Sequence, residues 1–162
     1  MKSVIVYASP HHGNTRKVAE RMAVKSGARL VDILREDLPD LSGYGLIGLA
    51  SGAYFGTLHK EIVRLAGEAV FAPEQRVFLV DTCGVRYKDY TYKVRLLLEE
   101  RGVVCLGRFQ CPGYDTYGPW KYLGGIRRGR PNEHDLQMAE QFIQQLLEAE
   151  KQGEKMAGQE RT

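Results

Sequence analysis

The chain has 162 residues, of which 43% are hydrophobic and 27% are charged, and its net charge at pH 7 is only +3. A chain of this length can bury about 70% of the surface that its unfolded form exposes, which is enough for one hydrophobic core. So small a net charge gives no reason to expect a nucleic-acid-binding protein. We predict one domain at residues 1–150 and a polar, disordered tail at 151–162, where the hydrophobic periodicity is lost.

Membrane insertion and disulfide bonding are not expected. The apolar runs are far shorter than the ~20 residues that span a bilayer, and the run after Met1 is too brief for a signal peptide. The cysteines Cys83, Cys105 and Cys111 include no CxxC pair, and their odd number indicates neither a disulfide framework nor a zinc site. We therefore predict a cytoplasmic protein with no membrane partner and no metal site.

Short β-branched runs alternate with helical patterns along the chain. The predicted strands are 4–8, 29–34, 46–50, 77–81 and 103–109, and the first and fourth are nearly continuous apolar runs that suit a sheet covered on both faces. Helices are predicted from apolar residues three and four apart at 18–23, 58–66, 94–98 and 132–147. This alternation specifies an α/β fold with a doubly wound, five-stranded parallel sheet in three layers.

The turn between the first strand and the first helix, Ser9 to Thr15, predicts a phosphate site. The first N–H groups of a helix have no intrahelical partner, and the helix dipole places partial positive charge there, so an anion is stabilised. Gly13 lets the backbone approach closely, Asn14 can cap the helix, and the hydroxyls of Ser9 and Thr15 can donate to phosphate oxygens. An ordinary capped turn is the alternative interpretation.

Spacing excludes two common phosphate loops, because Gly13 is followed by no G-K-[ST] and a single glycine cannot form G-x-G-x-x-G. The turn resembles that of flavodoxins, which ends in Gly-Asn-Thr ahead of the first helix and holds the phosphate of FMN. This chain has one residue more between Ser9 and Gly13, with histidine where threonine is expected. His11 and His12 therefore either donate to the phosphate or face solvent.

Two later segments also resemble flavodoxin loops. Residues 48–56 resemble the Gly-Ser-Pro-x-Tyr-Phe-Gly loop, with Gly52 in place of proline, and Tyr54 or Phe55 either stacks on a flat ring or packs as a plug. Residues 81–90 follow the fourth predicted strand, where flavodoxins present their second flavin loop. There Thr82, Cys83 and Gly84 would contact the pyrimidine side, and Tyr87 or Tyr90 would cover the other face.

The resemblance covers residues 3–105 at three sites in the same order. It implies a flavodoxin-like sheet of order 2-1-3-4-5 that binds FMN between strands one and three, flavodoxin being the standard example of that rule. The cofactor-binding residues that it implies are Ser9, His11, His12, Gly13, Asn14, Thr15, Ser51, Gly52, Ala53, Tyr54, Phe55, Gly56, Thr82, Cys83, Gly84, Tyr87 and Tyr90.

The function that follows is that of an FMN-binding electron-transfer flavoprotein, which needs no catalytic residue of its own because the flavin carries the redox chemistry. One alternative is an NAD(P)H-dependent flavin or quinone reductase of the same fold. Another is a flavodoxin-like binding module that lacks FMN. The expected partner is accordingly a redox protein or NAD(P)H.

Cys83 ends a predicted strand and precedes a basic loop, which is also the setting of a phosphatase nucleophile. That chemistry needs an arginine six residues on to clamp the phosphoryl oxygens, but position 89 is Asp89, which repels phosphate. We therefore expect Cys83 to be a small buried or flavin-side residue.

A long segment rich in glycine and aromatic residues, 107–131, has no assigned role. Its charged residues are mostly basic: Arg108, Lys121, Arg127, Arg128 and Arg130, against Asp115. A loop of this length usually has a function, and here it would dock an acidic protein, close over the flavin or hold a pyridine nucleotide. Basic residues among aromatic ones also suit single-stranded nucleic acid, but charge confined to one loop argues against that ligand. A solvated connector is the remaining alternative.

The resemblance also brings a contrast in charge. Flavodoxins typically surround the flavin with acidic residues, which lowers its reduction potential. Here the ring loops are flanked by mixed charges: Lys60, Arg86, Lys88 and Arg108 against Asp81 and Asp89. The sequence thus predicts a less negative potential.

Overall fold

The computed structural model describes residues 1–86 and 88–159, and of residues 157 and 158 only the backbone. Tyr87, a predicted flavin contact, therefore lies outside the described residues, as do the last three residues of the predicted tail. No helix in the described part of the chain is long and apolar enough to cross a membrane.

Five strands form one parallel sheet in the order β2-β1-β3-β5-β6. Their bounds are β1 Ser3–Ala8, β2 Arg29–Asp32, β3 Leu46–Tyr54, β5 Arg76–Cys83 and β6 Val104–Pro112. A further two-residue strand, β4 Thr57–Leu58, pairs antiparallel with the end of β3. Without β4 this is the order 2-1-3-4-5, so the predicted flavodoxin-like sheet is confirmed.

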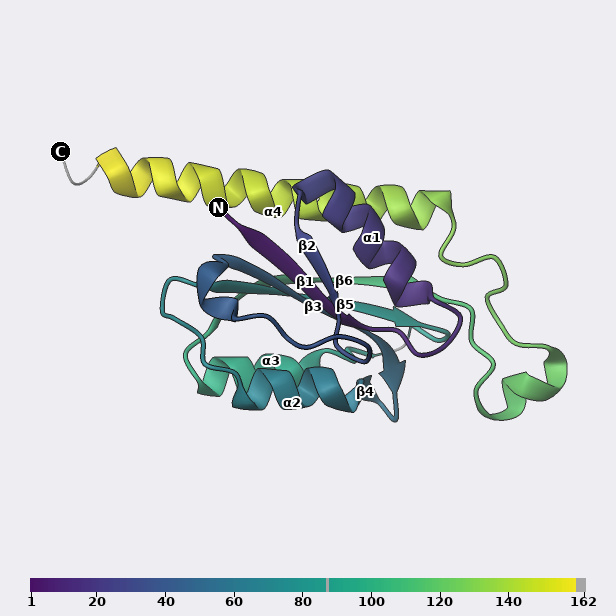
Figure 1. Cartoon of the computed structure of the whole chain (residues 1–162). Helices are drawn as coiled ribbons and strands as arrows, with labels where there is room; N and C mark the ends of the chain where they lie inside the picture. Colours follow the sequence, from purple (N-terminus) through teal and green to yellow (C-terminus); the bar gives the residue numbers. More distant parts are fainter. Residues whose placement is uncertain (87, 160–162) are drawn as a thin grey trace.

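Helices cover both faces of the sheet, which gives three layers (Figure 1). On one face lie α1 Asn14–Ser26 and α4 Glu133–Gln159, and on the other α2 Lys60–Glu68 and α3 Tyr92–Glu100. Successive residues of a strand point to opposite faces, so Ile5 and Phe78 pack under α1 and α4, whereas Val4 and Leu79 pack under α2 and α3. All of β1 is buried, as expected for a strand covered on both sides.

Amphipathic patterns explain why these segments are helical, and a glycine explains where the first helix ends. In α2, Ile62, Leu65 and Ala66 form the buried side. Gly27 ends α1 in the left-handed conformation, with φ 69°, which a residue without a Cβ adopts at little cost.

Two elements extend beyond the prediction. β3 continues to Tyr54 because its last residues pair with β4, and β6 continues to Pro112 because it pairs with β5 as far as Cys83. α4 continues to Gln159, so the predicted disordered tail is helical over the part that is described. Residues 151–156 are exposed, so the prediction from lost periodicity failed because good helix formers such as Glu, Lys, Gln and Met extend a helix without packing.

Candidate functional site

A cavity of about 580 Å³ lies where the carboxyl ends of β1, β3 and β5 meet. Open α/β sheets bind ligands at this edge, at the point where the strand order reverses, which here falls between β1 and β3. The volume is within the range of small-molecule and cofactor sites. Four segments line the cavity: the turn before α1, the hairpin of β3 and β4, the segment after β5 and the loop after β6.

The first three segments bring together the residues predicted from the sequence. Among the predicted residues that the structure describes, all line the cavity except Gly13 and Ser51. Ser51 is fully buried, and its hydroxyl donates to the Gly52 carbonyl at 2.6 Å and accepts from the His59 amide at 2.8 Å. Ser51 thus ties the hairpin to the start of α2.

The turn before α1 places glycine at the helix N-terminus. Gly13 is the N-cap, with φ 66°, and a Cβ there would meet nothing within 4 Å. Ser9 Oγ accepts a hydrogen bond from the Arg16 amide at 3.3 Å and keeps its own hydrogen for another acceptor. The expected capping by Asn14 is wrong, because Asn14 Nδ2 donates instead to the Tyr114 carbonyl at 2.7 Å.

A pair of hydroxyl groups lies beside this turn. Thr15 Oγ1 and Thr82 Oγ1 are 2.9 Å apart, and both residues are almost fully buried. One of the two hydroxyl hydrogens makes the bond between them, so the other remains to donate to an acceptor in the cavity. The pair joins α1 to the end of β5 and presents one donor near the helix N-terminus.

The hairpin supplies two aromatic residues in different environments. Tyr54 is half-buried, its ring meets that of His59 edge to face at 5.3 Å between centroids, and burial raises the pKa of its phenol to about 12. Phe55 is 90% exposed and adopts a left-handed φ of 49°, which is costly for a bulky residue and is characteristic of functional turns. Its ring meets that of Tyr117 edge to face at 5.8 Å.

The segment after β5 carries a thiol and a buried ring. Burial raises the pKa of Cys83 to about 12, so it remains a neutral thiol, in agreement with its rejection as a nucleophile. The Tyr90 hydroxyl donates to the Val85 carbonyl at 2.8 Å, and the ring is 7% exposed. Lys88 Nζ lies 5.4 Å from the centroid of that ring. Tyr90 is therefore buried and held by a hydrogen bond to the segment that precedes it.

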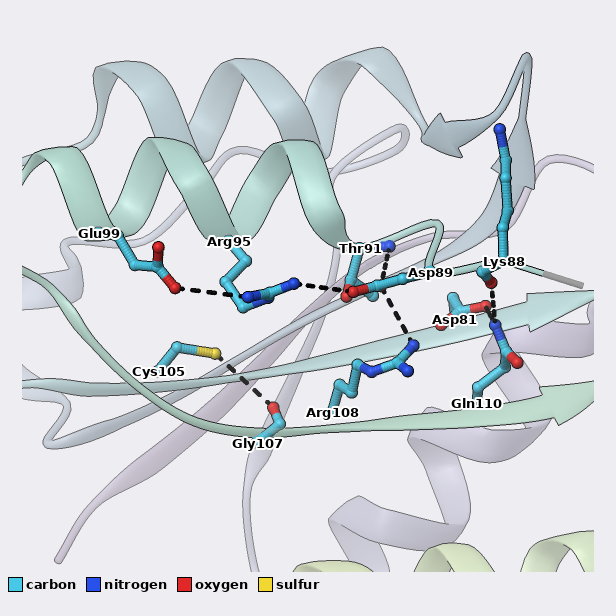
Figure 2. A network of polar contacts seen from close by, with 10 residues as sticks. All are labelled: Asp81, Lys88, Asp89, Thr91, Arg95, Glu99, Cys105, Gly107, Arg108 and Gln110. Atoms are coloured by element: carbon cyan, nitrogen blue, oxygen red, sulfur yellow. Dashed lines mark hydrogen bonds and ion pairs between the residues drawn. The ribbon is translucent and has the colours of Figure 1, made fainter.

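A polar network joins the segment after β5 to the neighbouring strand β6 and helix α3 (Figure 2). Gln110 Nε2 on β6 donates to Asp81 Oδ2 at 2.9 Å and to the Lys88 carbonyl at 3.1 Å. Asp89 is surrounded by donors: the Thr91 hydroxyl at 2.6 Å, Arg95 at 3.0 Å and Arg108 at 3.1 Å. Burial alone would raise the pKa of Asp89, but these hydrogen bonds outweigh it and hold that pKa below its usual value.

Asp81 is the least satisfied carboxyl of the described residues. It is completely buried, and its Oδ1 has no hydrogen-bond partner in the described part of the chain. Burial raises the pKa of Asp81 to about 6.

Closure over the flavin was one of the alternatives for residues 107–131, and part of that segment forms a fourth wall of the cavity. The loop after β6 contributes Gly113, Tyr114, Asp115, Thr116, Tyr117 and Trp120 to the lining. Its glycine- and aromatic-rich composition was a usable signal, but no pattern in the sequence shows that the loop folds back over the other three segments.

Several of the basic residues predicted to recognise a partner are used inside the protein. Arg130 pairs with Asp135 through two hydrogen bonds of 2.6 Å, and Arg128 Nε donates to the Gly124 carbonyl at 2.9 Å. Arg108 pairs with Asp89. All three residues hold the local fold, and the charges of Arg108 and Arg130 are compensated by their carboxylate partners.

The chain is similar to proteins known from sequence and from structure. No protein-family model matches it. It is 36% identical to the uncharacterized protein MJ0298 of Methanocaldococcus jannaschii over 149 residues, which are 91% of this chain and 99% of that protein. Oxidised flavodoxin 2 from Bacillus cereus superposes with a TM-score of 0.67 at 19% identity, over 92% of this chain and 99% of that one.

A flavoprotein from Lactobacillus acidophilus, solved in complex with FMN, superposes with a TM-score of 0.50 at 17% identity, over 67% of this chain and 92% of that one. At such identities these two structures establish the fold alone, and the fold is the one that the turn, hairpin and sheet order predict. The chain has a flavodoxin-like fold and belongs to the same family as the uncharacterized protein MJ0298 of Methanocaldococcus jannaschii.

Proposed function

We propose that this protein binds FMN in the cavity and transfers electrons between redox partners. The observation that carries the proposal is the arrangement of the cavity, with anion-binding groups at one end and aromatic and glycine residues at the other. The flavoprotein from Lactobacillus acidophilus, which has FMN bound, lends support as a protein of similar fold.

The anion end fits a phosphate without a lysine or arginine. The N-terminus of α1 offers backbone N–H groups and partial positive charge, and Gly13 leaves the approach open. Ser9 and the Thr15–Thr82 pair each keep a hydroxyl hydrogen for an acceptor. A phosphate monoester is the ligand group that this set of donors suits.

The other end fits a flat ring. The absence of a side chain at Gly52 allows the Tyr54 ring to pack closely against the backbone, since a Cβ at position 52 would lie only 3.2 Å from that ring. Cys83 and Gly84 at the end of β5 also line the cavity, as does Tyr90. Bound FMN would supply the one- and two-electron redox chemistry, while these residues orient the ring and exclude water from it.

The partner that we propose is a redox protein rather than NAD(P)H. A pyridine nucleotide needs cations for its phosphates, but Arg108 and Arg130 are paired with Asp89 and Asp135. The guanidinium groups of Arg127 and Arg128 are engaged in turn by the carbonyls of Gly84 and Gly124. A protein surface that meets the exposed Phe55 and Tyr117 at the cavity mouth requires no such cations.

The test is to identify the cofactor and then its reductant. Purified protein is expected to absorb in the flavin region and to release FMN on denaturation, and apoprotein is expected to bind FMN more tightly than riboflavin. NADPH alone is expected to leave the flavin oxidised. Equal affinities for FMN and riboflavin, or none for either, would contradict the proposed site, and bleaching by NADPH alone would favour the reductase.

A further inference from the structure

The loop between β6 and α4 reaches across the cavity and touches each of the other three walls. We define it as residues 113–131, the 113–131 loop. Its lining residues bring the aromatic rings of Tyr114, Tyr117 and Trp120 to the cavity. Figure 1 shows it as a projection beyond the sheet on the side where α1 begins.

Two hydrogen bonds tie the 113–131 loop to the predicted phosphate turn. Asn14 Nδ2 donates to the Tyr114 carbonyl at 2.7 Å, and His12 Nε2 is 2.9 Å from Thr116 Oγ1. The rings of His12 and Tyr114 are in contact, with 4.4 Å between centroids. His12 is exposed, and its ring and Nε2 join the turn to the loop.

Further contacts tie the loop to the two predicted ring-binding segments. Arg127 Nε donates to the Gly84 carbonyl at 3.3 Å, and a Cβ on Gly84 would lie 2.4 Å from Asp115 Oδ2. Glycine is thus required at position 84 for the loop to approach this closely. On the hairpin side, Tyr117 meets Phe55.

The loop has internal order of its own. Asp115 and Ile126 form a two-way backbone bridge, with N–H···O distances of 3.1 and 2.8 Å, and the Tyr114 hydroxyl donates to the Gly124 carbonyl at 3.0 Å. Between them lies a short 3₁₀ helix, Gly118–Leu123, which carries Trp120. A loop closed by these bonds can hold a side chain in a fixed position, unlike a solvated connector.

Trp120 is the side chain best suited to a flat ligand. The other lining tyrosine and phenylalanine rings are engaged within the protein. Tyr90 is held by its bond to Val85, and Tyr54 packs edge to face on His59. Tyr114 contacts His12 and donates to the Gly124 carbonyl, and Phe55 and Tyr117 meet edge to face. Trp120 is half-buried and lines the cavity, and its indole offers the largest π surface of any side chain there. We propose that the 113–131 loop is the fourth wall of the flavin site and that Trp120 stacks on the flavin ring, an inference that rests on the proposed function.

The experiment uses the fact that Trp120 is the only tryptophan in the chain. Wild-type apoprotein and the variants Trp120→Ala, Trp120→Phe and Tyr122→Ala are titrated with FMN and with riboflavin, and flavin absorbance and emission report binding. Tyr122 is the matched control, because it lies on the same 3₁₀ helix but is 86% exposed and does not line the cavity.

We expect Trp120→Ala to weaken FMN and riboflavin about tenfold alike, since stacking involves the ring and not the phosphate. Trp120→Phe should recover most of that affinity, Tyr122→Ala should bind as the wild type does, and FMN should quench the Trp120 emission of the wild-type protein. Energy transfer also quenches tryptophan emission at a distance, so quenching alone does not demonstrate stacking. The dissociation constants of the variants are the test of the proposal.

If wild-type protein binds FMN and Trp120→Ala binds it equally well, the inference is overturned and the proposed function stands. If wild-type protein shows no change in flavin absorbance or emission, both are overturned. A Trp120→Ala variant that does not fold leaves the decision to Trp120→Phe, whose dissociation constant must then exceed that of Tyr122→Ala by at least about twofold.

Discussion

The hydroxyl pair of Thr15 and Thr82 allows the anion end of the cavity to be tested at single-residue scale. Thr15→Val keeps the shape of the side chain and removes the hydroxyl, and a lost hydrogen bond to a charged group costs about 1.5–3 kcal/mol, or roughly ten- to a hundredfold in affinity. We expect that loss for FMN and a much smaller one for riboflavin, measured by quenching of flavin fluorescence. Thr15→Ser, which retains the hydroxyl, is the control. A similar loss for both ligands would place the phosphate elsewhere.

Asp81 makes stability depend on pH. Its pKa is raised from 3.8 to about 6 in the folded protein, so the stabilising effect of its protonated form is complete below pH 3.8 and is lost as the pH rises through 6. Holding the ionised carboxylate in this environment costs about 3 kcal/mol at neutral pH.

Asp81→Asn removes that dependence, because the amide has the shape of the protonated acid and no charge. Relative to wild type, the variant should gain about 2–3 kcal/mol of unfolding free energy between pH 4 and pH 8, measured by urea denaturation. Asp37→Asn, at an exposed site, should show no such gain. A constant difference between Asp81→Asn and wild type across this range would show that folding does not shift the pKa of Asp81.

The cations beside the site should affect the potential of bound FMN. Arg86 and Lys88 lie on the segment after β5, and Arg108 on β6 pairs with Asp89 of the same segment. A cation about 7 Å from the ring raises the reduction potential by on the order of 100 mV at an effective dielectric near 20, and by less where solvent screens it. Redox titration of Arg86→Gln and Lys88→Gln should therefore give more negative potentials than the control Lys25→Gln. Unchanged potentials would show that both side chains point away from the flavin.

Sequence reasoning at the residue scale succeeded where a local motif was available and failed where partners are distant in the chain. The Gly-Asn-Thr turn identified Ser9 and Thr15 as lining residues. It could not show that Asn14 bonds to Tyr114, because that partner lies a hundred residues away. For the same reason the Thr15–Thr82 pair was not predictable.

Among the elements, the contact of Gly84 with the 113–131 loop gives a test of how that loop is positioned. Gly84→Ala would place a Cβ within 2.6 Å of two Asp115 atoms, and overpacking of this kind costs about 1–3 kcal/mol. We expect a loss of unfolding free energy of that size in urea, with partial recovery in the double variant Gly84→Ala/Asp115→Gly. Gly43→Ala, where a Cβ meets nothing within 4 Å, is the control. If the double variant recovers nothing, Gly84 acts through another contact.

The major elements were predictable because each carries its own periodicity. The buried β1 and the amphipathic α2 are examples. β4 was not, because a two-residue strand has no period and exists only through its pairing with β3. The end of α4 was misjudged because propensity, not burial, extends it past residue 150.

For the whole molecule, alternating strands and helices predicted the class of fold, and the order of strands came from the resemblance carried by three loops. Periodicity alone does not determine which strands are neighbours, since a buried strand could bury its hydrophobic side chains at several places in the sheet. For the 113–131 loop the sequence offered several roles, closure over the flavin among them, and could not choose between them, because the resemblance ended at residue 105 and the loop has no repeating pattern.

The hydrogen bonds from His12 and Asn14 to the 113–131 loop join residues 104 and 100 positions apart. The cavity is therefore complete only when nearly the whole chain has folded, and partly folded forms lack one wall or another. A ligand of the cavity binds the native state alone, so it raises the free energy of unfolding by about 2.7 kcal/mol at a hundred times its dissociation constant. Thermal denaturation, which requires no knowledge of the reaction, can therefore detect such a ligand by a melting temperature that increases with its concentration.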